Sequence, residues 1–150
     1  MVTFRKTVLA NEQIYHIYNR GVDRRDIFTD KREFQRAFAT LKYYRFANPP
    51  VKLSRYLVLS QEDRKELTNK IVASSKLVDI FAYCLMPNHF HFLLKQLQSN
   101  GIAKFISNFT NSYTKYFNTK HERTGVLLQG VFKAVLVETN KQFIHLSRYI

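Results

Sequence analysis

The sequence predicts an α+β sandwich, in which helices cover one face of an antiparallel sheet. The 150 residues suffice for one domain with a buried core. Hydrophobic residues make up 45% of the chain and aromatic residues 15%, as in globular proteins. Segments with the period of strands and segments with the period of helices follow one another in the order strand, helix, strand, strand, helix, strand, helix.

The first strand covers residues 14–18, which are β-branched or aromatic apart from one histidine, and turn-forming residues follow it. Asp30 then predicts the N-cap of a helix over about 31–46. The next segment has a weaker pattern. Ser60 and the acidic residues after it predict a short helix that ends near residue 73.

A hairpin follows. Residues 76–86 form a strand with a nearly continuous apolar run, and Pro87 and Asn88 make the tight turn. Residues 89–95 form the return strand of the hairpin.

The remaining elements complete the order. Residues 102–120 form an aromatic amphipathic helix, and residues 131–137 alternate like a strand. Thr139 and Gln142 have the spacing of a capping box at the start of a last helix. This order is the split βαβ pattern of a ferredoxin-like sandwich with an added C-terminal helix, so we expect one domain over residues 1–150. Its uncovered sheet face is free for a ligand.

The charge balance is strongly basic. The chain has 24 Lys and Arg against 11 Asp and Glu, a net charge of +13. This excess argues against a neutral metabolic enzyme and favours a polyanionic partner, nucleic acid first and an anionic membrane second. One cysteine, Cys84, excludes an internal disulfide and a cysteine-rich zinc site. No segment has the length of a membrane span or the pattern of a signal peptide, so we expect a cytoplasmic protein without membrane contact.

The strongest chemical signal is His89-Phe90-His91. Alternate side chains of a strand point to the same face, so the two imidazoles project together while Phe90 enters the core. Two imidazoles on one face make half of a divalent metal site. The other interpretation is a pair of exposed polar residues on a half-buried strand.

Five segments resemble a known family in the same order and spacing. Residues 82–94, AYCLMPNHFHFLL, resemble the metal-binding segment of the HUH single-strand DNA endonucleases. Within that group the chain is most similar to the REP-associated tyrosine transposases. The other matching segments, which resemble the family's first strand, central helix, last-strand approach and nucleophile helix, are 15–21, 113–118, 125–133 and 143–150.

The resemblance implies a DNA transposase and endonuclease. Such enzymes nick and rejoin single-stranded DNA by attack of a tyrosine hydroxyl, which leaves a 5′-phosphotyrosine link. By this resemblance His89 and His91 hold the divalent cation, Mg²⁺ or Mn²⁺. The partner is single-stranded or hairpin DNA, and a homodimer is expected. A cation is needed because a tyrosine with a pKa of about 10 is a poor nucleophile at neutral pH.

Tyr149 matches the family's nucleophile in its sequence context. It lies on the final helix, away from the apolar stripe of Phe143, Leu146 and Ile150. Tyr116 is the second candidate, one turn after Tyr113, but the aromatic stripe of that central helix is more typical of a core.

The chain departs from the family pattern after Tyr149. In the family the helix continues to an asparagine, one turn later, that supplies the third metal ligand. This chain stops at Ile150, so either it is a domain truncated at its C-terminal end, which we expect, or it lacks that ligand. His145, one turn before Tyr149, could substitute for it.

Other residues have weaker signals. Arg20, Arg24, Arg25 and Lys133 are candidate DNA contacts, because arginine forks suit phosphates and guanine edges. His16 belongs to the family's first strand, and a buried, hydrogen-bonded histidine is its simplest interpretation.

Two other functions stay open at this point. A non-catalytic single-stranded nucleic-acid-binding module could use the same sheet, but it would not need the histidine pair. A zinc hydrolase could use His89 and His91, but it would need a nearby carboxylate, and the strand offers none.

Overall fold

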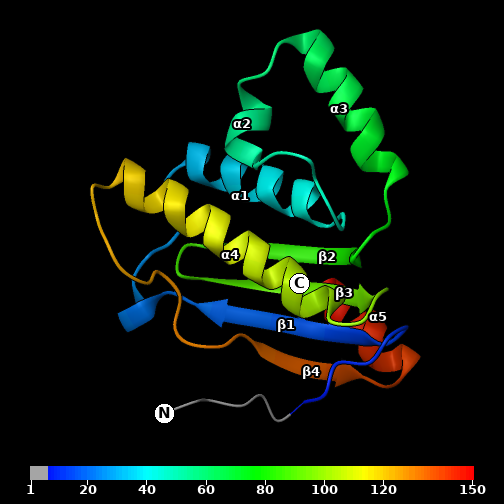
Figure 1. Cartoon of the computed structure of the whole chain (residues 1–150). Coiled ribbons are helices and arrows are strands. Elements are labelled where there is room, and N and C mark those ends of the chain that lie inside the picture. Colours follow the sequence, from blue (N-terminus) through cyan, green and yellow to red (C-terminus); the bar gives the residue numbers. More distant parts are fainter. Residues whose placement is uncertain (1–6) are drawn as a thin grey trace.

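The computed structural model describes residues 7–150 and contains one four-stranded antiparallel sheet (Figure 1). The strand order is β2-β3-β1-β4, which is the order of a ferredoxin-like sandwich, so the predicted fold class is confirmed. The two strands at the centre are the first strand and the histidine-bearing strand. The bounds are β1 Ile14–Arg20, β2 Val78–Met86, β3 His89–Gln96 and β4 Lys133–Val137.

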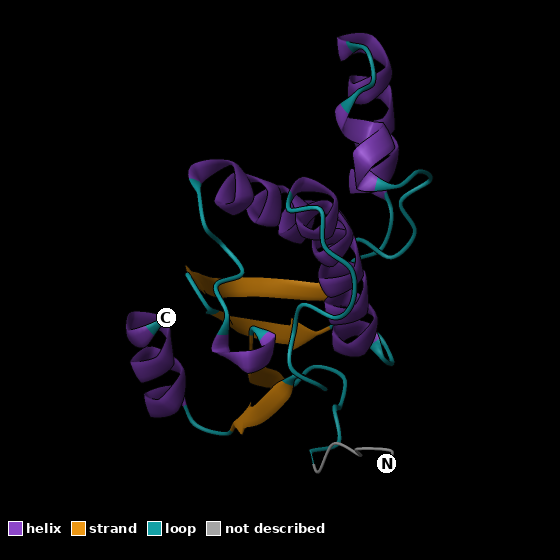
Figure 2. Ribbon diagram, turned by 90° about the vertical axis from the view of Figure 1, so that its left-hand side faces the viewer, coloured by secondary structure: helices purple, strands orange, loops and turns teal. Residues whose placement is uncertain are grey.

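The helices lie on both faces of this sheet, so the expectation that one face is uncovered is wrong: the added C-terminal helix packs against part of it (Figure 2). α1 (Lys31–Tyr44) and α4 (Gly101–Lys120) run side by side over one face. α5 (Asn140–Tyr149) lies on the other face, as the edge-on view of the sheet shows (Figure 2). α2 (Leu53–Leu57) and α3 (Gln61–Ala73) project outward beyond α1. No helix within residues 7–150 is long and apolar enough to span a membrane.

The core lies between the sheet and the α1–α4 layer. Tyr15 and Ile17 of β1 and Phe90 and Phe92 of β3 are fully buried there. Phe109 of α4 packs edge-on against both phenylalanines of β3, at centroid distances of 5.5 and 5.3 Å. Because side chains alternate along a strand, the residues between these core positions face the opposite side, where α5 lies.

The predicted helix starts agree with the structure. The Asp30 side chain accepts a hydrogen bond from the Glu33 amide, and Ser60 accepts one from the Asp63 amide. Both bonds of the Thr139–Gln142 capping box are present. These short polar side chains satisfy amides that a first helical turn leaves without partners.

Several boundaries differ from the prediction. The second strand begins at Val78 and not at residue 76, because Lys76 forms only an isolated bridge with Phe46. The helix predicted over 31–46 ends at Tyr44, so Phe46 lies outside it. The last strand begins at Lys133 and not at residue 131, because Gly130 adopts a left-handed φ of 58° and turns the chain.

α2 was not predicted. Its five residues are too few to show a helical period, and Leu53 is the only one of them that is fully buried. Leu53 joins a small second core with Tyr43, Phe46 and Ile71. Tertiary packing between α1 and α3 therefore stabilises this turn of helix, and local propensity contributes less.

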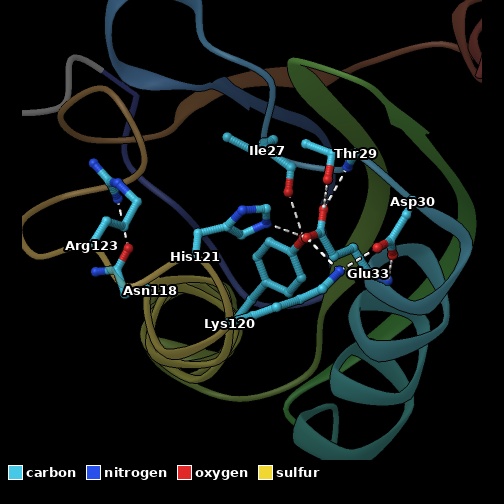
Figure 3. A network of polar contacts seen from close by, with 9 residues as sticks. Ile27, Thr29, Asp30, Glu33, Asn118, Lys120, His121 and Arg123 are labelled. Atoms are coloured by element: carbon cyan, nitrogen blue, oxygen red, sulfur yellow. Dashed lines mark hydrogen bonds and ion pairs between the residues drawn. The ribbon is translucent and has the colours of Figure 1, made fainter.

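A buried carboxylate connects the start of α1 with the end of α4 (Figure 3). Glu33 has no exposed surface and accepts hydrogen bonds from the amide and hydroxyl of Thr29. Lys120 Nζ, at 2.9 Å, and His121 Nε2 also contact its carboxylate. Burial acts to raise the pKa of Glu33, but the hydrogen bonds from Thr29, Lys120 and His121 outweigh it and hold that pKa below its ordinary value.

Replacing Glu33 by Gln is expected to lower the free energy of unfolding at pH 7 by about 2–3 kcal/mol, because four donor groups lose a buried, charged acceptor. A carboxyl with a lowered folded-state pKa stabilises the fold above its unfolded pKa and loses that contribution as the pH falls through the folded value. The difference between wild type and variant should therefore shrink towards acid pH in urea titrations. Glu66→Gln, which affects only the exposed pair with Lys70, should change stability by less than about 0.5 kcal/mol.

Candidate active site

Strand pairing aligns the candidate residues in rows across the face of the sheet that lies opposite α1 and α4. We call this the open face, because α5 is the only α-helix within residues 7–150 that packs against it. Tyr18 of β1 is paired with His91 on one side and with Lys133 of β4 on the other. In the next row Arg20 is paired with His89. Directly opposed residues of antiparallel strands point to the same face. Three strands thus bring together residues that lie more than a hundred positions apart in the sequence.

The two histidines of β3 lie next to each other on this face. Their rings are perpendicular, with centroids 5.1 Å apart, and Phe90 between them is fully buried on the other face. Both histidines are half-buried. This is the geometry that strand alternation predicts.

Each imidazole is held through its Nδ1 atom. His89 Nδ1 lies 2.6 Å from Asn88 Oδ1, so it is protonated and donates. His91 Nδ1 lies 2.9 Å from His16 Nε2. Within residues 7–150, neither Nε2 atom of the His89–His91 pair has a hydrogen bond. The two atoms are thus available to a ligand, and their rings are oriented by neighbours.

Burial and the two neighbouring histidines lower the pKa of His91 to about 4. Burial also lowers the pKa of His16, which is half-buried and hydrogen-bonded. His91 is therefore neutral at pH 7, which is the form of imidazole that binds a metal ion.

The final helix brings Tyr149 to the histidines. The Tyr149 ring lies edge-on to His91, with centroids 6.1 Å apart. At the other end of α5, Phe143 packs edge-on against Phe81 of β2 at 5.3 Å. Tyr149 remains 67% exposed. Its hydroxyl is therefore accessible to a substrate that reaches the histidine pair.

The other two candidate tyrosines lie on the opposite side of the sheet. Tyr113 is buried in the core, and its hydroxyl donates to the carbonyl of Ile27. Burial raises the pKa of Tyr113 far above its ordinary value. Tyr116 lies in α4 beneath the guanidinium of Arg36. Of the three candidates, Tyr149 alone shares a face with His89 and His91.

A pocket of about 460 Å³ opens beside the histidines. Three of the four basic residues predicted from the sequence line it, whereas Arg25 is exposed and lies outside it. Arg20 Nε donates to Gln129 Oε1 at 2.8 Å, which holds the guanidinium at the rim. The full lining is Tyr18, Asn19, Arg20, Arg24, Asn88, His89, His91, Gln129 and Lys133.

Sequence reasoning missed four lining residues, which are Tyr18, Asn19, Asn88 and Gln129. Tyr18 could have been found, because it lies two positions after His16 on the same strand and therefore points to the same face. Asn88 could have been found as well, because it directly precedes the histidine pair. Gln129 had no such signal, because a loop distant in sequence brings it to Arg20.

The turn after β1 determines where Arg24 lies. Gly21 is essential there, because a Cβ atom would lie 2.2 Å from the carbonyl oxygen of Arg25. Asp23 and Arg24 both have left-handed φ angles, 54° and 58°. Non-glycine residues adopt this conformation at a cost, so the surrounding hydrogen bonds must maintain the turn. Those bonds include Gly21 N to the carbonyl of Asn88.

The donor atoms fit half of a metal site. Two imidazoles present Nε2 atoms on one face, and imidazole is a ligand for divalent transition metals. Within the described residues, no group of three or more His, Cys, Asp and Glu side chains is arranged to hold a metal ion. His145 is exposed on α5 and, in the same part of the chain, makes no hydrogen bond or ring contact with either histidine.

A family model described as "Transposase IS200 like" matches residues 50–150. The chain belongs to this family. It is therefore a DNA transposase, and the family consists of DNA-cleaving enzymes. A comparison with curated proteins found no match.

Two solved structures resemble the fold of this transposase. One is a REP-associated tyrosine transposase bound to a REP hairpin, with a TM-score of 0.58 and 15% identity over 100% of this chain and 70% of that one. The other is a protein from Deinococcus radiodurans that is described as a transposase, with a TM-score of 0.51 and 12% identity over 99% of this chain and 95% of that one. At identities this low, the structural similarity establishes a common fold and nothing beyond it.

Proposed function

We propose that this transposase nicks and rejoins single-stranded DNA through a 5′-phosphotyrosine at Tyr149. His89 and His91 would hold the divalent cation, Mg²⁺ or Mn²⁺. The observation that carries the proposal is the contact between Tyr149 and His91 on the open face of the sheet, at 6.1 Å between ring centroids. A nucleophile and a pair of free imidazole nitrogens are thereby adjacent, beside a basic pocket.

The reaction exchanges one phosphodiester bond of the DNA for one between the DNA and the tyrosine. The Tyr149 oxygen gives up its proton and attacks the scissile phosphorus, so that a bond from tyrosine to phosphorus forms. The bond from phosphorus to the 3′ oxygen breaks, and that oxygen takes up a proton and leaves as a free 3′-hydroxyl. A 3′-hydroxyl can later attack the phosphotyrosine and restore the strand without ATP. A bound cation would supply Lewis-acid stabilisation of the charge on the phosphate oxygens.

The basic residues of the pocket would hold the strand. Arg20 and Arg24 suit phosphates because their guanidinium groups offer paired donors, and Lys133 adds a point charge from β4. Arg25 would contact the phosphate backbone of the DNA outside the pocket. The similar REP-associated transposase is bound to a REP hairpin, which supports single-stranded or hairpin DNA as the substrate.

The proposal is tested with one oligonucleotide labelled in turn at each end. A 5′-phosphotyrosine leaves the 3′-labelled fragment attached to the protein after denaturation and releases the 5′-labelled fragment with a free hydroxyl. We expect this adduct with Mn²⁺ or Mg²⁺ and none with EDTA. DNA binding without an adduct under any of these conditions would identify a non-catalytic binding module and contradict the proposal.

The contact between His16 and His91 makes His16 a positioning residue. His16→Leu should weaken Mn²⁺ binding by about 10- to 100-fold, because the His91 ring loses the partner that orients it. His16→Gln can bring its amide oxygen near the former Nε2 position, where it can accept the Nδ1–H of His91, and should restore most of the affinity. Electron paramagnetic resonance of free Mn²⁺ measures this directly. Equal affinity in His16→Leu and wild type would show that His91 does not need this partner.

A further inference from the structure

A second hollow of about 500 Å³ lies on the helical layer, on the opposite side of the sheet from the histidines. Its walls come from α1 and α4, which run side by side (Figure 1), and the residues before and within α2 close one end. We call it the α1–α4 groove. It is lined by basic, aromatic and uncharged polar side chains of these elements.

Arg36 is the unusual residue of this groove. Its Nε atom is buried and has no hydrogen-bond partner, and within residues 7–150 its guanidinium pairs with no carboxylate. The guanidinium lies over the ring of Tyr116, 4.8 Å from its centroid. Burial lowers the pKa of Arg36. A partly buried cation without a counter-charge is costly, so an anionic ligand would relieve that cost.

The surroundings of Arg36 add to its charge. Lys52 and Lys115 also line the groove, whereas no Asp or Glu does. Lys120 lies at the far end, but Asp30 and Glu33 already neutralise it (Figure 3). Three cations therefore face a hollow without acidic residues, which favours an anion.

The uncharged lining fits one class of anion. The rings of Tyr44 and Tyr116 offer apolar surface, and Asn108 and Asn111 offer amide donors and acceptors. The Tyr44 hydroxyl accepts a hydrogen bond from the Leu53 amide at 3.3 Å, which connects its ring to the start of α2. Aromatic surface, amides and guanidinium are the groups that bind nucleotides, and the volume is that of a small-molecule site.

We propose that the α1–α4 groove binds the phosphate group of a nucleotide through Arg36 and Lys115, with the base against Tyr44. This site is separate from the histidines and independent of the reaction proposed for them. Its ligand is either a free nucleotide or one nucleotide of a DNA strand, since both present the same phosphate.

The test uses the amide NMR spectrum of the protein in EDTA, titrated in separate arms with dAMP and with a twelve-nucleotide single strand lacking any hairpin. We expect shifts in α1 and α4 in at least one arm. Arg36→Met and Lys115→Met should raise the dissociation constant about tenfold or more, because each removes a charge-assisted contact. Arg32→Met and Lys104→Met are matched controls on the same helices, exposed and outside the groove.

The two arms separate the sources. Shifts with dAMP identify a free nucleotide, and shifts with the strand alone identify DNA. Absence of shifts in α1 and α4 in both arms would overturn the proposal. Equal losses in the groove variants and the control variants would also overturn it, because general surface charge would then explain the binding. If Arg36→Met folds poorly, Arg36→Lys takes its place in the comparison. It keeps the positive charge without the forked guanidinium and should retain only part of the affinity.

Discussion

Tyr149→Phe is expected to abolish the covalent protein–DNA adduct and to lower strand cleavage by on the order of 10³-fold or more, because the attacking oxygen is removed. Tyr149 is 67% exposed, and its hydroxyl has no hydrogen-bond partner within residues 7–150. Its loss should therefore change the free energy of unfolding by less than about 0.5 kcal/mol. A lost adduct would thus report chemistry and not unfolding.

Two tyrosines serve as controls. Tyr116→Phe should keep the adduct, because Tyr116 lies on the opposite side of the sheet from the histidines. Tyr113→Phe should keep it as well, although it should cost about 1–2 kcal/mol of stability through the lost bond to the Ile27 carbonyl. An adduct that persists in Tyr149→Phe and disappears in Tyr116→Phe would assign the nucleophile to α4.

His89→Ala and His91→Ala are each expected to lower cleavage by at least about 10²-fold, because each removes one of the two imidazoles that would hold the cation. Both proteins should remain folded, since the side chains lie on the open face of the sheet and not in the core. DNA affinity should change little, because Arg20, Arg24 and Lys133 are untouched.

The measurement compares nicking at rising Mn²⁺ concentration. Partial recovery of His89→Ala at high Mn²⁺ would indicate weakened metal binding, whereas full activity of both variants in EDTA would contradict a metal role. His145→Ala is the matched control on α5, and we expect it to retain activity, because His145 makes no contact with the pair in the described part of the chain.

Local rules predicted those parts of the molecule that depend on near neighbours. Alternation along a strand is a property of two residues, so it placed His89 and His91 on one face. Capping joins a side chain to the amide three positions later, so Asp30, Ser60 and Thr139 predicted helix starts that the structure contains.

Features that depend on distant segments could not be found in this way. The hydrogen bond from Arg20 to Gln129 joins residues from β1 and a late loop, and no local pattern connects them. α2 exists because it packs against α1 and α3. Arg36 has no signal of its own in the sequence, because only the packing of α4 against α1 half-buries it, with no carboxylate partner within residues 7–150.

The attachment of α5 has an energetic consequence. None of its residues is fully buried, and its ring contacts with the sheet are those of the half-buried Phe143 with Phe81 and the exposed Tyr149 with His91. The free energy that keeps a segment closed scales with the apolar area it covers, so α5 should open at far lower cost than β1 or β3. The proposed nucleophile therefore lies on a segment that we expect to open more readily than the two central strands, so that the helix should exchange between docked and detached states while the sheet that carries the histidines stays folded.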